Sequence, residues 1–253
     1  MAHKFFLGLG LFSMSEISVV SPYRVHQSAP LMVLGMHRSG TSFLTGSLQL
    51  AGLELGRHSA SNPHNLKGNR ESQELVAIHD ALLARHGFAW DFPPSGPLPW
   101  TESDVATVHQ WMTQYEGKPR WGFKDPRSLL LVEGWRTLLP EVQFVGIFRH
   151  PAAVALSLDA RGGMPLAKAY DLWKAYNSRL LALHRQQPFP LLCFDDDEQV
   201  LHEKLDRVLF DLGLNSPLEE YFFSPELKHH QGENTPLPDD LDVLYQELRR
   251  RGL

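Results

Sequence analysis

The stretch LMVLGMHRSGTSFLTGSLQLAG, residues 31–52, decides the fold. Four apolar residues at 31–34 end at Gly35, and after Gly40 apolar residues recur with helical spacing. This pattern predicts a strand, a tight loop and a helix. The loop has the glycine spacing of a phosphate cradle, G-x-x-x-x-G followed by two hydroxyl residues. Because glycine permits sharp turns, we expect the N–H groups of residues 39–42 to point at an anion on the helix N-terminus.

The loop departs at one position from the pattern of nucleoside triphosphatases. Those proteins carry a lysine directly after the second glycine, where this chain has Thr41. The positive charge lies inside the loop instead, as Arg38. The sequence therefore predicts an anion-binding loop that differs from an ATPase loop.

The rest of the chain alternates between short apolar runs and helical patterns. This alternation predicts an α/β fold, a three-layer αβα arrangement with a mainly parallel central sheet. Further strands are expected at residues 120–125, 142–148 and 191–194. Helices are expected over residues 68–87, 102–115, 152–158, 165–187 and 239–250, with two more that end at 138 and 212.

Composition and charge limit the classes of protein to which the chain can belong. The chain has 253 residues, 43% of them hydrophobic, and no compositional break, so we expect one domain over residues 30–253. A net charge of −5 argues against a general nucleic-acid binder. The single cysteine, Cys193, excludes an internal disulfide and is compatible with a cytoplasmic location. None of the 13 histidines has zinc-type spacing, so no metal site is expected.

Residues 1–29 are expected to form a leader before this domain. They include the apolar run FFLGLGLF at 5–12, which is far shorter than the ~18 residues that a membrane span needs. A run of this length suits the core of a secretory signal, but no small-x-small cleavage site follows it. A signal segment and a frayed or extended start both stay open, and no membrane span is expected.

Three basic residues stand at the carboxyl ends of expected strands: Arg38, Lys124 and Arg149. Because parallel sheets bind ligands at that edge, we expect the three charges to converge on a phosphate-type ligand. Ser157 follows Arg149 by eight residues, about two turns into the expected helix. It can reach the same ligand group only if the chain folds back after the strand.

Several motifs together carry a family resemblance. GMHRSGTS at 35–42, FKDPR at 123–127 and FRHPAAVALSL at 148–158 resemble the sulfotransferase family that uses 3′-phosphoadenosine 5′-phosphosulfate (PAPS). The chain is similar to the bacterial branch, which also has a G-x-x-E-x-x-x-x-V-x-x-x-D stretch, here residues 68–80. The L-W-x-x-Y-N helix of that branch matches residues 172–177.

The resemblance covers about residues 31–212 and implies a P-loop sulfotransferase-like fold and a donor site. PAPS would give its sulfuryl group to a hydroxyl or amine acceptor by in-line displacement and leave as 3′-phosphoadenosine 5′-phosphate (PAP). Arg149 and Ser157 would hold the 3′-phosphate. The loop would hold the 5′-phosphosulfate through Gly35, Arg38, Ser39, Gly40, Thr41 and Ser42.

The candidates for catalytic residues follow from the places where charge changes during sulfuryl transfer. Negative charge grows on the oxygen that bridges to the leaving phosphate, and a cation there stabilises the transition state more than the ground state. The resemblance assigns this role to Arg38, with Lys124 as a second candidate. The acceptor must lose a proton, and the resemblance indicates Glu71 as the base. A glutamate in the first turn of a helix is also favoured by the helix dipole, so a capping role for Glu71 stays open.

Two other functions stay open. A P-loop kinase or nucleoside triphosphatase would use Asp195, which follows the apolar run at 191–194, as its magnesium-binding acid. The missing lysine of the loop argues against that class. A non-catalytic nucleotide-binding protein would keep the loop and the arginines but would need no base.

The acceptor is left open among small molecules, carbohydrates and lipids, because acceptor pockets are built from variable loops. Asn69 and Arg70 stand where the family commonly has aromatic residues before the glutamate. The side chain of His37 is expected to matter less than its backbone. His79 is expected at the polar edge of its helix. The oligomeric state stays open as well.

Overall fold

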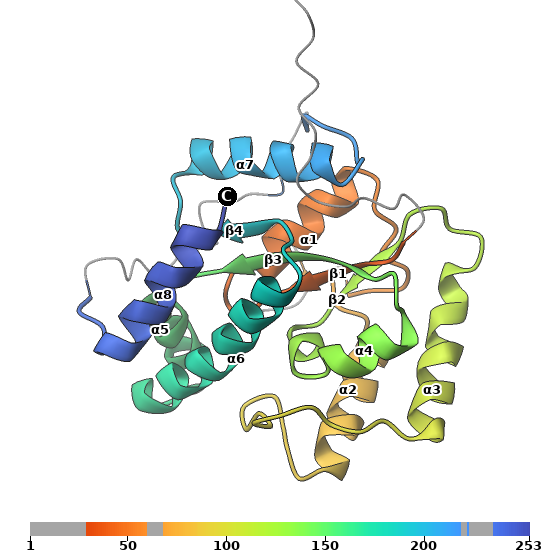
Figure 1. Cartoon of the computed structure of the whole chain (residues 1–253), viewed down its shortest axis with the longest axis horizontal. Helices are drawn as coiled ribbons and strands as arrows, with labels where there is room; N and C mark the ends of the chain where they lie inside the picture. Colours follow the sequence, from red (N-terminus) through yellow and green to blue (C-terminus); the bar gives the residue numbers. More distant parts are fainter. Residues whose placement is uncertain (1–28, 60–67, 219–221, 223–234) are drawn as a thin grey trace, which may run out of the picture.

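Four parallel strands form the centre of the protein (Figure 1). A computed structural model describes residues 29–59, 68–218, 222 and 235–253. In sheet order the strands are β2 (Gly122–Lys124), β1 (Leu31–Leu34), β3 (Gln143–Phe148) and β4 (Leu191–Cys193). The predicted parallel sheet is confirmed, and every strand is buried along its whole length.

The register brings the carboxyl ends of the strands to one edge. Val33 of β1 lies opposite Lys124 on one side and Val145 on the other, and Phe148 of β3 lies opposite Cys193. The loop after β1 and the residues that follow β2 and β3 therefore begin side by side. This edge is where the sequence predicts the ligand.

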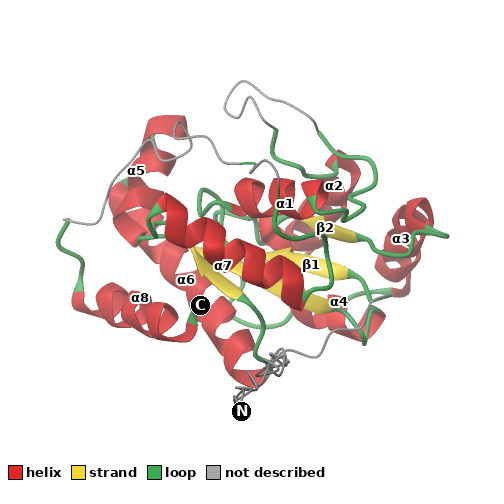
Figure 2. Cartoon of the chain, turned by 90° about the horizontal axis from the view of Figure 1, so that it is seen from above, coloured by secondary structure: helices red, strands yellow, loops and turns green. Residues whose placement is uncertain are grey.

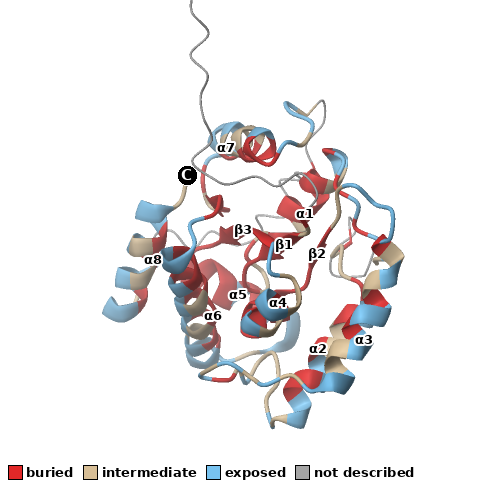
Figure 3. Ribbon diagram, turned by 45° about the vertical axis from the view of Figure 1, so that its right-hand side comes forward, coloured by how far each residue is buried: buried red, intermediate tan, exposed pale blue. Residues whose placement is uncertain are grey.

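Helices cover both faces of the sheet, as predicted for the three-layer fold (Figures 1 and 2). Leu31 and Val33 pack into a core with α1 (Thr41–Leu50) and α7 (Glu198–Asp211). Met32 and Leu34 point to the other face, where the larger core lies; Figure 3 shows the buried layer between the helices. The helices of this second face are α2 (Gln73–Arg85), α3 (Glu102–Met112), α4 (Val132–Leu138), α5 (Pro151–Gly162), α6 (Leu166–Gln186) and α8 (Asp239–Arg251). Two short 3₁₀ helices, η1 (Thr113–Tyr115) and η2 (Pro126–Leu130), follow α3 and β2.

Two helix boundaries differ from prediction in ways that shape the site. The helix predicted from residue 68 begins only at Gln73, because the side chain of Ser72 accepts a hydrogen bond from the N–H of Leu75 and caps α2. Helix α5 runs a turn past its predicted end at residue 158 and stops at Gly163, whose φ is 67°. The first shift leaves residue 71 outside α2, and the second adds residue 161 to α5.

The predicted leader lies outside the described residues, apart from Ala29, which is buried. The apolar run at 5–12 lies outside them as well. Within the described part, no helix is both long and apolar enough to cross a membrane.

Candidate active site

The loop between β1 and α1 is built around two glycines that no larger residue could replace. Gly35 has a φ of 155°, and a Cβ there would lie 2.4 Å from the carbonyl oxygen of Ile147. Gly40 is the N-cap of α1 with a φ of 87°, and a Cβ there would lie 2.4 Å from the ring of Phe194. The sequence spacing thus marks two positions of close backbone approach.

The start of α1 is open to an anion. No side chain caps the helix, and its first turn carries no acidic residue. The helix dipole and the N–H groups of the first turn therefore face the cavity without an internal counter-charge. Arg38, just before this turn, has a φ of 66°, a conformation that costs energy for a residue with a side chain.

Arg38 is held by the serine that the sequence places two turns into the next helix. Its Nε donates to Oγ of Ser157 at 2.8 Å, although the two residues are 119 positions apart. Helix α5 therefore folds back from β3 toward the loop, which is the condition that Ser157 must meet to share a ligand with Arg149. Ser157 is buried behind Arg38.

Arg149 follows β3 directly and is almost completely buried. Its Nε donates to Oδ1 of Asp195 at 3.2 Å, and its guanidinium lies over the ring of Phe194 at 5.3 Å. The main chain of His150 also donates to Asp195. Asp195 therefore serves as the counter-charge of Arg149, not as the free acid that a magnesium site needs.

Arg161 joins this group and was not predicted. It lies one turn beyond Ser157 on α5, so the two side chains share a helix face. Burial, followed by the charges of Arg161 and Arg149, lowers the pKa of Arg38. Neither Arg38 nor Arg161 has a carboxylate partner among the described residues, whereas Arg149 pairs with Asp195.

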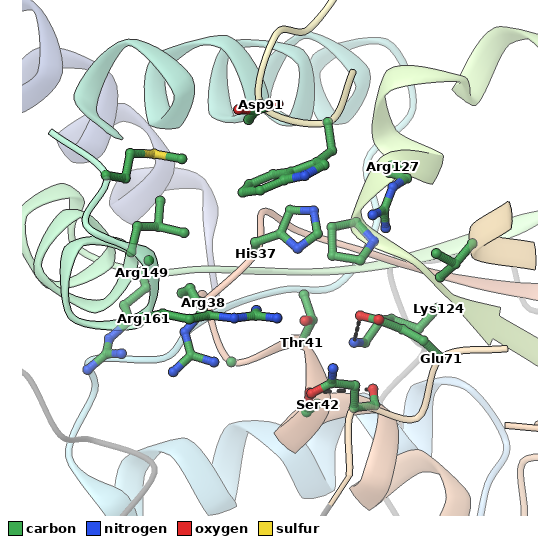
Figure 4. Close-up of a pocket in the computed structure, with 18 of the residues that line it drawn as sticks. His37, Arg38, Thr41, Ser42, Glu71, Asp91, Lys124, Arg127, Arg149 and Arg161 are labelled. Carbon is green, nitrogen blue, oxygen red and sulfur yellow. Dashed lines mark hydrogen bonds and ion pairs between the residues drawn. The ribbon is translucent and has the colours of Figure 1, made fainter. Parts of the chain in front are cut away.

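Lys124 and Glu71 form a close ion pair at the other end of the cavity, with 2.6 Å between Nζ and Oε1 (Figure 4). The Lys124 side chain is buried and that of Glu71 is largely so. Because α2 begins at Gln73 and Ser72 is its cap, Glu71 is not in the first turn of a helix. The predicted position in the helix is wrong, and with it the alternative that the helix dipole explains this glutamate.

One cavity of about 730 Å³ connects these groups. Figure 4 shows Arg38, Arg149 and Arg161 at one end, Lys124 and Glu71 at the other, and Thr41 and Ser42 between them. Of the predicted site residues, those that line the cavity are Arg38, Gly40, Thr41, Ser42, Glu71, Lys124 and Arg149. The other three stand behind this wall: Gly35 shapes the loop, Ser157 holds Arg38, and Ser39 is fully buried.

The side chain of His37 forms part of the cavity wall, whereas only its backbone was expected to matter. Its ring lines the cavity 4.7 Å from the indole of Trp90 and 6.1 Å from the ring of Tyr176. Burial lowers the pKa of His37 to about 3, and the charges of Arg127, Lys124 and Arg161 act in the same direction against that of Asp125. The imidazole is therefore neutral at physiological pH. Trp90 comes from the segment between α2 and α3, and no local pattern pairs it with the histidine.

A buried polar network connects α2 with Arg127 in the wall of the cavity. His79 is fully buried, not at the polar edge of its helix as predicted. Its Nδ1 bonds to Oδ2 of Asp125 at 2.8 Å, and Nε1 of Trp135 donates to its Nε2 at 3.1 Å. Arg127, which lines the cavity, donates to Oδ1 of Asp125 at 2.9 Å and to Oδ1 of Asp80 at 2.6 Å. The network thus joins α2 to the end of β2.

Burial alone would raise the pKa of Asp125. The hydrogen bond from His79 and the charge of Arg127 outweigh burial and hold the pKa well below its usual value. Asp125 is therefore ionised over the physiological range. Among the residues that the structure describes, no three His, Cys, Asp or Glu side chains gather as metal ligands.

Comparison with solved structures supports the fold. The sulfotransferase domain of the olefin synthase from Synechococcus PCC 7002 is 17% identical and covers 91% of this chain and 96% of its own, with a TM-score of 0.52. Sulfotransferase STF1 from Mycobacterium tuberculosis H37Rv is 16% identical over 88% of this chain and 77% of its own, with a TM-score of 0.40. No family model and no curated protein matches the sequence. The first of these structures shows that the chain has the predicted P-loop sulfotransferase-like fold.

Proposed function

We propose that the protein is a PAPS-dependent sulfotransferase. The observation that carries this proposal is the convergence of Arg38, Arg149 and Arg161, with Ser157, beside an open phosphate-binding loop. Guanidinium groups that lie close together repel one another, and a polyanion that binds between them is stabilised by all three charges. PAPS carries one anionic group for the loop and a second, its 3′-phosphate, for the arginines. The shared fold is consistent with this function.

The residues of the cavity fit the two anionic groups of PAPS. The N–H groups at the start of α1, with Thr41 and Ser42, are suited to the 5′-phosphosulfate. Arg149 and Arg161 are suited to the 3′-phosphate, since a guanidinium can donate two parallel hydrogen bonds to one phosphate. When bound, PAPS supplies a sulfuryl group on a phosphate that is ready to leave.

Arg38 and Glu71 then take the two catalytic roles. Arg38 places its positive charge at the oxygen between the sulfuryl group and the phosphate, where negative charge develops. Glu71 accepts the proton of the acceptor hydroxyl through Oε2, which has no partner among the described residues. Lys124 engages Oε1 and so fixes the orientation of the carboxylate.

The 3′-phosphate role predicts a selective loss of affinity. Arg161→Ala should weaken binding of PAP about tenfold or more, because it removes a charge-assisted contact. Binding of adenosine 5′-monophosphate, which lacks the 3′-phosphate, should stay unchanged. Arg149→Gln should show the same selective loss of PAP affinity. Calorimetry with both nucleotides measures this selectivity, and an equal loss for the two nucleotides would contradict the assignment.

The base role separates an enzyme from a non-catalytic binder. Glu71→Gln keeps a hydrogen-bonding partner for Lys124 but cannot take up a proton at neutral pH. We expect kcat to fall by about 10²-fold or more, with PAP affinity unchanged. The matched control is Glu74→Gln, on the exposed surface of α2, which should have wild-type activity. Full activity in Glu71→Gln would remove Glu71 from the mechanism.

A kinase or triphosphatase is less well supported. Such a function needs Asp195 free to bind magnesium, whereas this carboxylate pairs with Arg149 and with the main chain of His150. It also needs the lysine that the loop lacks. Both features favour a donor that brings an anionic group to the arginine.

A further inference from the structure

The cavity has two chemically different halves. One half holds the arginines and the start of α1 and matches the proposed donor. The other half, between the loop and helix α6, has no proposed ligand. Beyond the donor residues, the described lining of the cavity includes the rings of His37 and Trp90 and the apolar side chains of Val76, Pro126 and Met164, beside polar and charged side chains such as Gln73 and Lys168. This second half is open for the acceptor.

The charges of this second half are already paired. Lys168 contacts Asp91 at 2.6 Å, and Arg127 is held between Asp80 and Asp125. His37 is neutral. The donor half, in contrast, contains Arg38 and Arg161, which have no carboxylate partner within the part of the chain that the structure describes. Among the described residues, the second half therefore offers no spare charge to an ionic acceptor, and burying an unpaired charge there would be costly.

The rings of the second half form a fixed wall. The His37 and Trp90 rings are 4.7 Å apart and inclined at 57°. The hydroxyl of Tyr176 donates to the carbonyl oxygen of Trp90 at 2.9 Å and holds the loop that carries the indole. Neither nitrogen of His37 has a hydrogen-bond partner among the described residues, and its Nε2 is buried. A rigid aromatic wall favours a flat ring that can pack against it.

We propose that this half is the acceptor subsite and that it takes an uncharged aromatic ring bearing the hydroxyl that is sulfated. The inference rests on the proposed function and names its substrate class. In the reaction, the O–H bond of the phenol breaks and its proton goes to Glu71. A new O–S bond forms as the S–O bond to the 5′-phosphate breaks, and the electron pair of that bond leaves on the phosphate oxygen beside Arg38.

The test compares three probes on the full chain loaded with PAP, by calorimetry: 2-naphthol, its saturated counterpart trans-2-decalol, and 6-hydroxy-2-naphthoic acid. We expect 2-naphthol to bind, and the decalol to bind about two- to tenfold more weakly because it cannot stack. The carboxylate should bind about tenfold or more weakly, because the arginines are occupied by PAP and the subsite has no free cation. With PAPS, 2-naphthol should be sulfated.

Two variants sharpen the test. Trp90→Leu should weaken 2-naphthol about fivefold or more while PAP affinity stays unchanged. Phe92→Leu, in the same loop but exposed, is the matched control and should change nothing. Asp91→Asn frees Lys168 and should improve binding of the naphthoic acid about threefold, with no gain for 2-naphthol.

Three results would overturn the acceptor proposal while the proposed function stands: PAP binds but 2-naphthol does not, the carboxylate binds as well as 2-naphthol, or Trp90→Leu leaves 2-naphthol affinity unchanged. Failure of PAP itself to bind would overturn the proposed function and the acceptor proposal together.

Discussion

Replacing Arg38 with alanine should lower kcat for sulfuryl transfer by about 10²- to 10³-fold. Arg38 lies in the loop and is directed by its hydrogen bond to Ser157. Its charge is needed most when negative charge develops on the leaving phosphate, so the loss should appear in kcat and not in KM. Steady-state turnover of PAPS with 2-naphthol measures both constants.

Two further variants control this result. Ser157→Ala leaves the charge of Arg38 but removes the group that directs it, so a smaller loss in kcat is expected. Arg136→Ala removes an exposed arginine of α4 and should have wild-type kinetics. If Arg38→Ala raises KM and leaves kcat intact, Arg38 contributes to ground-state binding only, and the transition-state role is wrong.

Replacing Asp125 with alanine should lower the free energy of unfolding by about 3–5 kcal/mol, the size expected when a buried ion pair loses one partner. The carboxylate is fully buried and contacts both His79 and Arg127, so its removal leaves Nδ1 of His79 without its acceptor and Arg127 with Asp80 as its remaining carboxylate partner. Urea denaturation followed by tryptophan fluorescence measures the change. Asp240→Asn, at an exposed ion pair with Lys174, is the control and should change stability little.

The loss of unfolding free energy in Asp125→Ala should depend on pH in a defined direction. The folded protein holds the pKa of Asp125 below its value in the unfolded chain, which is about 3.9. The stabilisation is therefore complete above about pH 5 and is lost as pH falls further. The stability difference between wild type and Asp125→Ala should be constant from pH 5 upward and narrow below about pH 4. A difference that grew on acidification would contradict the assigned direction.

The strands and the glycine-bounded loop between β1 and α1 could be predicted from sequence because their signals are local. An apolar run, a glycine at a fixed interval and a change to helical spacing all lie within residues 31–52. The placement of Arg38, Lys124 and Arg149 along one edge of the sheet also follows, since parallel strands end together, but Lys124 lies at the other end of the cavity from the two arginines and pairs with Glu71 (Figure 4). These elements carry most of the residues that we propose for the donor site.

The remaining site features depend on contacts between distant segments. The pairing of Glu71 with Lys124 requires α2 to begin only at Gln73, and this start depends on the cap formed by Ser72, one residue after Glu71. Arg161 could have been predicted only from its position one turn after Ser157. That argument requires α5 to extend past residue 158, and the predicted helix ended there. The burial of His79 depends on Asp125 and Trp135, which no local pattern connects with α2.

Thermal unfolding of the wild-type chain with nucleotides tests the central claim most directly. At a PAP concentration of about 100 times Kd, binding should stabilise the fold by about 2.7 kcal/mol. For a chain of this size that corresponds to a rise in Tm of roughly 5–10 °C. The rise should shrink in Arg161→Ala, and ATP with magnesium should give little shift. A rise with ATP and magnesium but none with PAP would contradict the proposal that this cavity binds a 3′-phosphorylated sulfuryl donor.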